Sequence, residues 1–182
     1  MRVEPRAEGF AVWLTGLPGS GKSTLAKLLE ARLRDEQGRF VEVLDGDEVR
    51  KGLSRDLGLS KEDREEHARR VSYVAKVLAR NGVVAVVALI SPYEASRSEA
   101  EATIGPGRFV EVFVKAPLEV CERRDPKGLY ARARRGEINN MTGIQDPYEE
   151  PSAPDLVVDT TRGAPEESVD ELISGLRALG KL

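Results

Sequence analysis

Short apolar runs rich in β-branched residues alternate along the chain with longer stretches of helical periodicity. The short runs predict strands over residues 10–15, 40–45, 83–90, 109–114 and 155–160. The longer stretches predict helices over 22–37, 61–81, 93–103, 117–124 and 165–179. Residues 83–90 are apolar on both faces, as in a central strand that helices cover on both sides. This alternation predicts an α/β fold of three layers, with a central parallel sheet of about five strands and right-handed crossovers.

The first predicted strand ends in a segment that cannot continue it, LTGLPGSGKST at residues 14–24. This segment fits the P-loop pattern G-x-x-x-x-G-K-[ST] and lies between a strand and a helix, as that motif requires. In such a loop, backbone N–H groups surround phosphate oxygens at the positive end of the helix. The alternative is a glycine-rich turn without a ligand. We predict ATP and Mg²⁺ as cofactors, with the nucleotide held by Gly16, Leu17, Pro18, Gly19, Ser20, Gly21, Lys22, Ser23 and Thr24.

Composition limits the classes of partner. The chain has 182 residues, so we predict a single domain over residues 1–182. Its net charge is −3, with acidic and basic residues interspersed, which argues against a nucleic-acid partner. The sequence holds no apolar leader and no apolar run of about 18 residues, so we expect a cytoplasmic protein without membrane contact. Cys121 stands alone, which excludes an intramolecular disulfide and favours a small buried hydrophobic residue.

The second predicted strand ends in the segment LDGDEVR, which contains two aspartates. Asp45 and Asp47 therefore lie at the carboxyl edge of the sheet, beside the P-loop, where ligands bind in such sheets. Their side chains would point the same way unless Gly46 bends the chain, and one of them could instead cap the next helix. The third predicted strand ends without an acid, so these aspartates must support Mg²⁺ or accept the proton of an attacking hydroxyl. We place Mg²⁺ on Ser23 and Asp45. The pattern favours a kinase for a small hydroxyl-bearing substrate over a GTPase, since no NKxD-like motif is present.

The predicted helix 61–81 brings further charge to the same edge. Ser60 is a good N-cap, with Asp63 three residues on, and a buried stripe recurs at helical spacing: Ala68, Val71, Ala75 and Leu78. Arg64 and His67 share another face near the helix start, and with Arg50 they could clamp an anionic substrate. The alternative is a solvent-exposed charged face, which is favoured for Arg69 and Arg70 and left open for Arg64 and His67.

Two loops complete the predicted edge. The third strand runs into ISPYEASR, which places Ser91 where a catalytic or binding loop is expected, although Ser91 could equally cap the following helix. Residues 125–151 combine basic groups with glycine, proline and paired asparagine, and are too long and polar for an ordinary connection. We predict a mobile lid that excludes water from phosphoryl transfer, with a charged surface hairpin as the alternative.

Several blocks together resemble the adenylylsulfate (APS) kinase family. The segments GLPGSGKST, LDGDEVRKGLS, EDREEHARR, ISPY and PLEVCERRDPKGLYARARRGEI…TGIQDPYE occur in this order and cover nearly the whole chain. The P-loop alone carries little weight, whereas the DGD-x-VR, ISPY and RDPKGLY blocks are far more specific. The resemblance implies transfer of the ATP γ-phosphoryl group to the 3′-hydroxyl of adenosine 5′-phosphosulfate, which yields PAPS for sulfate assimilation. It also implies a homodimer, and a functional coupling to ATP sulfurylase is possible.

The resemblance also implies roles for individual residues. Asp47 matches the acid near the acceptor hydroxyl, Arg50 and Arg64 match the APS-binding arginines, Ser91 matches a serine described as a phosphoserine, and Lys127 matches the lid lysine. The chain departs from the family at four positions. It has Glu48 and His67 where asparagine is common, and Leu59 and Met141 where two phenylalanines sandwich the adenine. Lys22, Asp47 and Ser91 are thus the predicted catalytic residues, and the predicted substrate-binding residues are Asp45, Asp47, Arg50, Leu59, Arg64, His67, Ile90, Ser91, Lys127, Leu129 and Met141.

Three other readings stay open. The chain could phosphorylate a different nucleotide or a sugar acid, because P-loop kinases for those substrates also end the second strand in acids. It could instead be a non-catalytic nucleotide-binding partner of an ATP sulfurylase, although the intact Lys22, Ser23, Asp45 and Asp47 argue against lost chemistry. A nucleic-acid-dependent ATPase is disfavoured by the acidic balance and by the missing acid on the third strand.

Overall fold

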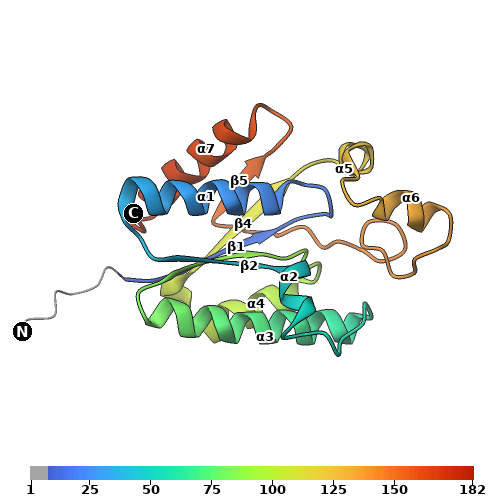
Figure 1. The fold of residues 1–182 in the computed structure, drawn as a ribbon, viewed down its shortest axis with the longest axis horizontal. Helices are drawn as coiled ribbons and strands as arrows, with labels where there is room; N and C mark the ends of the chain where they lie inside the picture. The colour runs from blue at the N-terminus through green and yellow to red at the C-terminus, as the bar shows by residue number, and fades with distance from the viewer. Residues whose placement is uncertain (1–7) are drawn as a thin grey trace, which may run out of the picture.

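In the computed structural model, which describes residues 8–182, five parallel strands form one sheet (Figure 1). The strands lie in the order β2-β3-β1-β4-β5. Their bounds are Ala11–Thr15 for β1, Val41–Asp45 for β2, Val84–Ala88 for β3, Phe109–Lys115 for β4 and Leu156–Asp159 for β5. Every ladder is parallel, with β1 pairing to both β3 and β4 at the centre. The predicted α/β fold is confirmed.

Helices cover both faces of the sheet, as Figure 1 shows. Helices α1 (Lys22–Gln37) and α7 (Pro165–Ala178) lie on one face, and α3 (Lys61–Arg80) and α4 (Glu94–Ile104) lie on the other. The shorter elements are α2 (Gly46–Lys51), the 3₁₀ turn η1 (Pro106–Arg108), α5 (Leu118–Arg124) and α6 (Leu129–Arg134). Among the described residues, no helix is both long and apolar enough to cross a membrane.

The two hydrophobic cores explain the apolar pattern of the strands. One core packs β-strand residues such as Val12 and Val86 against the apolar stripes of α1 and α7. The other packs Trp13 and Val87 on the opposite faces of the same strands against α3 and α4. All five residues of β1 and of β3 are buried, because helices cover the central strands on both sides. The sheet is therefore a fixed frame for the loops at its edges.

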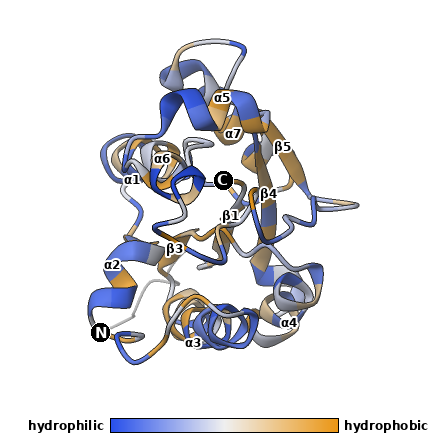
Figure 2. Cartoon of the chain, turned by 90° about the vertical axis from the view of Figure 1, so that its right-hand side faces the viewer, coloured by the Kyte–Doolittle hydropathy of each residue, from blue (hydrophilic) through white to orange (hydrophobic). Residues whose placement is uncertain are grey.

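The predicted elements agree closely with the structure, and most of the differences lie at the carboxyl edge. Strand β3 ends at Ala88, two residues before the predicted end, and the chain then continues into the loop that contains Pro92. Helices α2 and α6 and the turn η1 were not predicted, because each is only one or two turns long. Figure 2 looks onto this edge, which α2, α5 and α6 surround.

Candidate active site

A cavity of about 730 Å³ opens at the carboxyl edge of the sheet. Its walls come from the P-loop, α2, the start of α3, residues 88–92, the segment 124–142 and the segment 160–168. A cavity of this size is in the usual range for small-molecule sites. Of the predicted site residues, all but three line it; the exceptions are Gly16, Leu17 and Ser20 of the P-loop. The fold thus gathers residues from six separate segments at one place.

The P-loop has the backbone shape that phosphate binding requires. Gly21 is the N-cap of α1 in the left-handed region, with φ of 105°. Gly19 also has a positive φ, 80°, and a Cβ there would lie 3.0 Å from the carbonyl oxygen of Cys121. A side chain at either glycine would therefore strain the loop. The positive end of α1 faces the cavity, since Lys22 and Ser23 at its start line the wall.

Lys22 is the buried cation of this loop. Its Nζ donates to the carbonyl oxygens of Gly16 and Leu17, both at 2.8 Å, and its side chain is almost fully buried. Burial, together with the nearby charge of Lys127, lowers the pKa of the Lys22 ammonium group to about 7. Phosphate groups in the cavity would favour the charged form of this lysine. Gly16 and Leu17 thus hold Lys22 without lining the cavity themselves.

Ser23 and Asp45 form a pair of oxygen ligands beside the P-loop. The Ser23 hydroxyl donates to Asp45 Oδ2 at 2.5 Å, across the gap between α1 and the end of β2. A hydroxyl and a carboxylate in contact are the hard oxygen donors that Mg²⁺ prefers, so the residues present fit this ion. Asp45 also accepts from the backbone N–H of Asp47 at 3.0 Å and thereby caps α2. Because the helix begins at Gly46, the two aspartates do not lie on one extended segment.

Asp47 contacts the segment predicted as a lid. Its carboxylate accepts from Nζ of Lys127, which lies 80 residues later in the chain. Both side chains are more than half exposed, so this ion pair adds little to stability. The same segment is anchored more firmly by Tyr130, whose buried hydroxyl donates to the Pro18 carbonyl at 2.8 Å. The segment therefore packs onto both the P-loop and α2.

Arg50 and Arg64 supply positive charge at the opposite wall. Arg50 Nη1 donates to the Gly58 carbonyl at 2.8 Å, and Arg64 donates to the carbonyls of Leu59 at 3.0 Å and Asn140 at 2.6 Å. Within residues 8–182, neither guanidinium forms an ion pair. Burial lowers the pKa of both groups, and the charge of Arg64 lowers that of Arg50 further. Two unpaired cations at a cavity wall suit an anionic ligand.

Comparisons with known proteins agree with this site. The adenylylsulphate kinase family matches residues 8–159. The adenylyl-sulfate kinase of Paraburkholderia xenovorans is 53% identical over 176 residues, which are 97% of each chain. The chain belongs to the adenylylsulphate kinase family. The APS kinase of Mycobacterium tuberculosis, solved in complex with AMPPNP and APS, has a TM-score of 0.89 and 47% identity, with 93% of this chain and 98% of that chain covered. The hexameric APS kinase of Thiobacillus denitrificans has a TM-score of 0.73 and 37% identity, with 98% of this chain and 31% of that chain covered.

The guanidinium of Arg64 links the two segments that carry Leu59 and Met141. Leu59 and Met141 both line the cavity, and Arg64 bonds the carbonyl of Leu59 and that of Asn140, next to Met141. Leu59 is 43% exposed, whereas Met141 is only 7% exposed and packs in a small core with Tyr130. The sequence pattern did not predict the bridge, because Arg64 and Asn140 are 76 residues apart in the chain.

Ser91 does not cap the following helix, so that alternative is wrong. Helix α4 begins at Glu94, and its N-cap is Tyr93, without a side-chain cap bond. The Ser91 hydroxyl accepts instead from Nε1 of Trp13 at 3.0 Å, in the interior of the protein. Ser91 also has φ of 37°, in the left-handed region that few residues other than glycine adopt. Trp13 is a contributor that sequence reasoning missed, because its apolar run indicated only a buried strand.

Two further contributors to the P-loop had no recognisable sequence signal. Thr160 and Arg124 contact the outer side of the loop: the Thr160 hydroxyl donates to the Ser20 carbonyl at 2.7 Å, and Arg124 donates to the Thr160 carbonyl at 2.8 Å. Both line the cavity. Cys121, as predicted, is a fully buried residue in the core below the lid segment.

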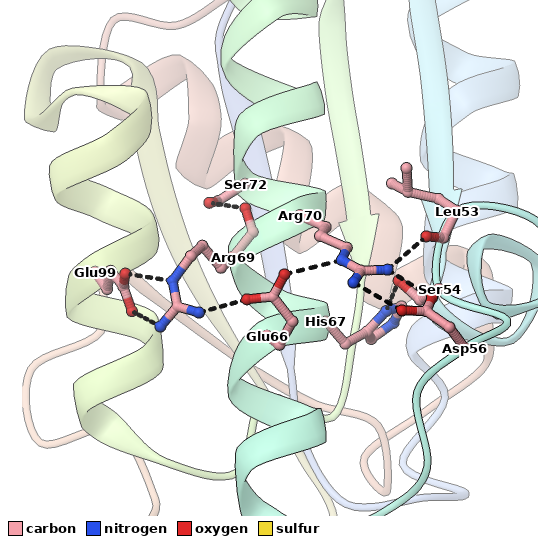
Figure 3. Close-up of polar contacts among 9 residues, drawn as sticks. All are labelled: Leu53, Ser54, Asp56, Glu66, His67, Arg69, Arg70, Ser72 and Glu99. Atoms are coloured by element: carbon pink, nitrogen blue, oxygen red, sulfur yellow. Dashed lines mark hydrogen bonds and ion pairs between the residues drawn. The ribbon is translucent and has the colours of Figure 1, made fainter.

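Arg69 and Arg70 form a network on the outer side of α3, which Figure 3 shows. Arg69 pairs with Glu66 and Glu99 in an exposed arrangement, as expected. Arg70, by contrast, donates to both carboxylate oxygens of Asp56, at 2.7 and 2.9 Å, and to the Leu53 carbonyl at 2.9 Å. Arg70 thus lies on the solvent-accessible charged face, as predicted, and its contacts hold the loop after α2 against α3.

His67 is buried, so the alternative of an exposed helix residue is wrong. Its side chain is 5% exposed, its Nδ1 lies 2.9 Å from the Ser54 hydroxyl, and its Nε2 has no partner among the described residues. Burial and the charges of Arg50, Arg70 and Arg64 lower the pKa of His67 to about 4. The ring is thus neutral at pH 7.

This burial predicts a measurable acid sensitivity. Above pH 6.5 His67 is neutral in the folded and the unfolded chain; between pH 6.5 and 4 only the unfolded chain takes up the proton, so stability falls with pH. The loss approaches about 3 kcal/mol near pH 4. We expect His67→Asn to remove it, as measured by urea unfolding of both proteins from pH 7.5 to 4. His67 is the only histidine, so the difference isolates this group, and parallel stability curves would contradict the burial of a neutral ring.

Proposed function

We propose that the chain transfers the γ-phosphoryl group of ATP to the 3′-hydroxyl of adenosine 5′-phosphosulfate, giving ADP and PAPS. The observation that carries this proposal is one cavity that joins three features. The P-loop forms one wall, two arginines without ion-pair partners among the described residues lie at another, and Asp47 lies between the carboxyl edge of the sheet and Lys127 of the predicted lid. The activity of the family, to which the chain belongs, is the same reaction. An acceptor with a sulfated phosphate is an anion, which Arg50 and Arg64 suit.

The P-loop residues bind and orient the nucleotide in this proposal. Backbone N–H groups at the cavity wall, from Gly19 and from Gly21 to Thr24, hold the phosphates, and Lys22 leaves its two carbonyl partners for the β- and γ-phosphate oxygens. Ser23 and Asp45 would hold Mg²⁺, which neutralises charge on those phosphates when bound. Catalysis then rests on positioning and charge stabilisation rather than on covalent chemistry.

Asp47 acts at the acceptor hydroxyl. It accepts the proton from the 3′-oxygen as that oxygen forms its bond to the γ-phosphorus and the bond from phosphorus to the ADP oxygen breaks. Lys127 is released from Asp47 to contact the transferred group, while the lid segment excludes water. Ile90 and Ser91 form the wall behind the acceptor, with Leu129, His67 and Met141 around it. This direct transfer needs no phosphoserine, and the buried position of the Ser91 hydroxyl supports it; a phosphorylated Ser91 stays a prediction.

The reaction is tested by an assay that couples ADP release to a colour change, with ATP and adenosine 5′-phosphosulfate as substrates. Adenosine 5′-phosphate, gluconate and shikimate serve as alternative acceptors under the same conditions. We expect turnover with adenosine 5′-phosphosulfate alone. Equal or greater turnover with another acceptor would overturn the assigned substrate, and nucleotide binding without any turnover would favour a non-catalytic partner.

Aromatic substitutions test where the adenine ring of the acceptor substrate binds. Leu59→Phe is expected to tighten binding of adenosine 5′-phosphosulfate by up to about 1–3 kcal/mol, because a restored stack on the adenine is worth that much. Met141→Phe is expected to gain less, since Met141 is nearly buried and overpacking costs about 1–3 kcal/mol. Calorimetric titration in the presence of ADP measures both affinities. Nucleotide affinity is the control; variants that change it and leave acceptor affinity unaltered would contradict the pocket assignment.

The assembly and location are part of the same proposal. We propose a homodimer in the cytoplasm, functionally coupled to an ATP sulfurylase that supplies the substrate, without nucleic-acid or membrane partners. Light scattering measures the oligomer directly, with a hexamer as the alternative that the Thiobacillus denitrificans kinase illustrates. A pull-down with a sulfurylase, scored together with coupled turnover, tests the association.

A further inference from the structure

A partly buried ion pair lies behind the cavity wall, and the proposed mechanism does not use it. Arg97 of α4 is 2% exposed, and its Nε donates to Glu111 Oε1 of β4 at 2.7 Å. The backbone N–H of Glu111 donates in turn to Asp155, before β5, at 2.7 Å. Removing these charges from water is costly, and such pairs often contribute no more stability than apolar residues of similar volume. The pair therefore calls for an explanation other than stability.

The second contact of Arg97 supplies one. Nη1 donates to the carbonyl oxygen of Ser91 at 2.9 Å, in the interior of the protein. Ser91 has φ of 37°, a conformation that is strained for a residue with a Cβ and persists only where its surroundings hold it. A charge-assisted bond to its carbonyl is a strong restraint of this kind. Glu111 fixes the guanidinium so that it can provide that bond.

Other contacts hold the neighbouring atoms of the same wall segment, residues 90–92. Thr15 donates its hydroxyl proton to the Ile90 carbonyl at 2.7 Å, Trp13 donates to the Ser91 hydroxyl, and the Pro92 carbonyl accepts from the N–H of Glu149 at 2.8 Å. Arg97 is the one charged side chain among these donors. Ile90, Ser91 and Pro92 all line the cavity, so a shift of this segment would reshape the acceptor wall directly.

We propose that Arg97, held by Glu111, is a positioning residue for the acceptor. It keeps the Ser91 peptide in its left-handed conformation and so places the wall against which the 3′-hydroxyl is aligned with the γ-phosphorus. This inference rests on the proposed function. Arg97 acts through Ser91 and does not touch the nucleotide side of the cavity, because the P-loop lies on other elements.

The double variant Arg97→Met/Glu111→Met separates positioning from stability. Since a buried pair replaced by apolar residues of similar volume is often neutral or stabilising, we expect a Tm equal to or above that of the wild type. We expect kcat/KM for adenosine 5′-phosphosulfate, at saturating ATP, to fall by about 10–100-fold, since small misplacements of reacting groups have effects of this size. The KM for ATP should change by less than about threefold. Arg97→Lys keeps the charge facing Glu111 but cannot serve both partners, and it should show the same acceptor-specific loss.

The surface pair Arg69 and Glu99 is a matched control, because it is also an Arg–Glu pair involving α4 but is exposed and remote from the wall segment. Arg69→Gln/Glu99→Gln should keep the wild-type kcat/KM for both substrates. Wild-type acceptor kinetics in the double methionine variant would overturn the inference, as would an equal loss for ATP and acceptor. Should that variant fail to fold, Arg97→Lys is measured instead. Wild-type acceptor kinetics in Arg97→Lys, or an equal loss for ATP and acceptor, would then overturn the inference. A wild-type enzyme that does not phosphorylate adenosine 5′-phosphosulfate would instead overturn the proposed function.

Discussion

Asp47→Ala is expected to lower turnover of adenosine 5′-phosphosulfate by about 10²–10⁴-fold, the contribution typical of a general base. The reason is its position: Asp47 lies in the first turn of α2, lines the cavity and contacts Lys127 of the lid segment. Asp45, which caps the helix and bonds Ser23, remains in place, so the nucleotide side should be intact. Steady-state kinetics measures the loss of turnover, and calorimetric titration on the same preparation measures the affinity for ATP.

Glu48→Ala is the matched control for this experiment. Glu48 is the next carboxylate on the same helix, is exposed, and pairs only with Lys51 among the described residues. It does not line the cavity, so we expect wild-type turnover from this variant. An Asp47→Ala enzyme that retains more than about a tenth of wild-type activity would exclude the general-base role. A parallel loss of ATP affinity would instead indicate that Asp47 acts in nucleotide binding.

Lys22→Met is expected to lower kcat by about 10²–10³-fold, as the loss of a single donor aimed at developing charge does elsewhere. Lys22 is the buried cation at the start of α1, and burial has already lowered its pKa to about 7. The energetic cost of its desolvation is offset only when phosphate oxygens replace the carbonyls of Gly16 and Leu17. We therefore expect the variant to lose most affinity for ATP and less for ADP, as measured by titration with each nucleotide.

Lys27→Met controls for the loss of a lysine from the same helix. Lys27 is exposed on α1, outside the cavity, and its replacement should leave nucleotide affinity and turnover unchanged. Thermal unfolding of both variants shows whether the freed carbonyls of Gly16 and Leu17 loosen the loop. Undiminished turnover in a folded Lys22→Met enzyme would contradict the phosphate-binding role of this residue.

The part of the site that could be predicted is the part carried by local motifs. The P-loop, the two aspartates after β2 and the Ser60 cap with Asp63 each depend on residues a few positions apart, and the structure places them as expected. The sequence did not predict whether His67 is buried or exposed. Its helical spacing suits a surface or a buried position equally, and only the packing of the loop after α2, with Ser54 beside the ring, buries it.

The sequence by itself determined the α/β architecture, the P-loop and the family, because hydrophobic periodicity and short motifs are encoded by neighbouring residues and survive any arrangement of distant segments. Tertiary structure alone decided which distant groups meet. It set Trp13 against the Ser91 hydroxyl, Arg64 between Leu59 and Asn140, and Arg97 between Glu111 and the Ser91 carbonyl. These contacts join elements whose separation in the chain carries no periodic signal. They follow from the strand order and from helix packing, which bring the carboxyl ends of the strands to one edge.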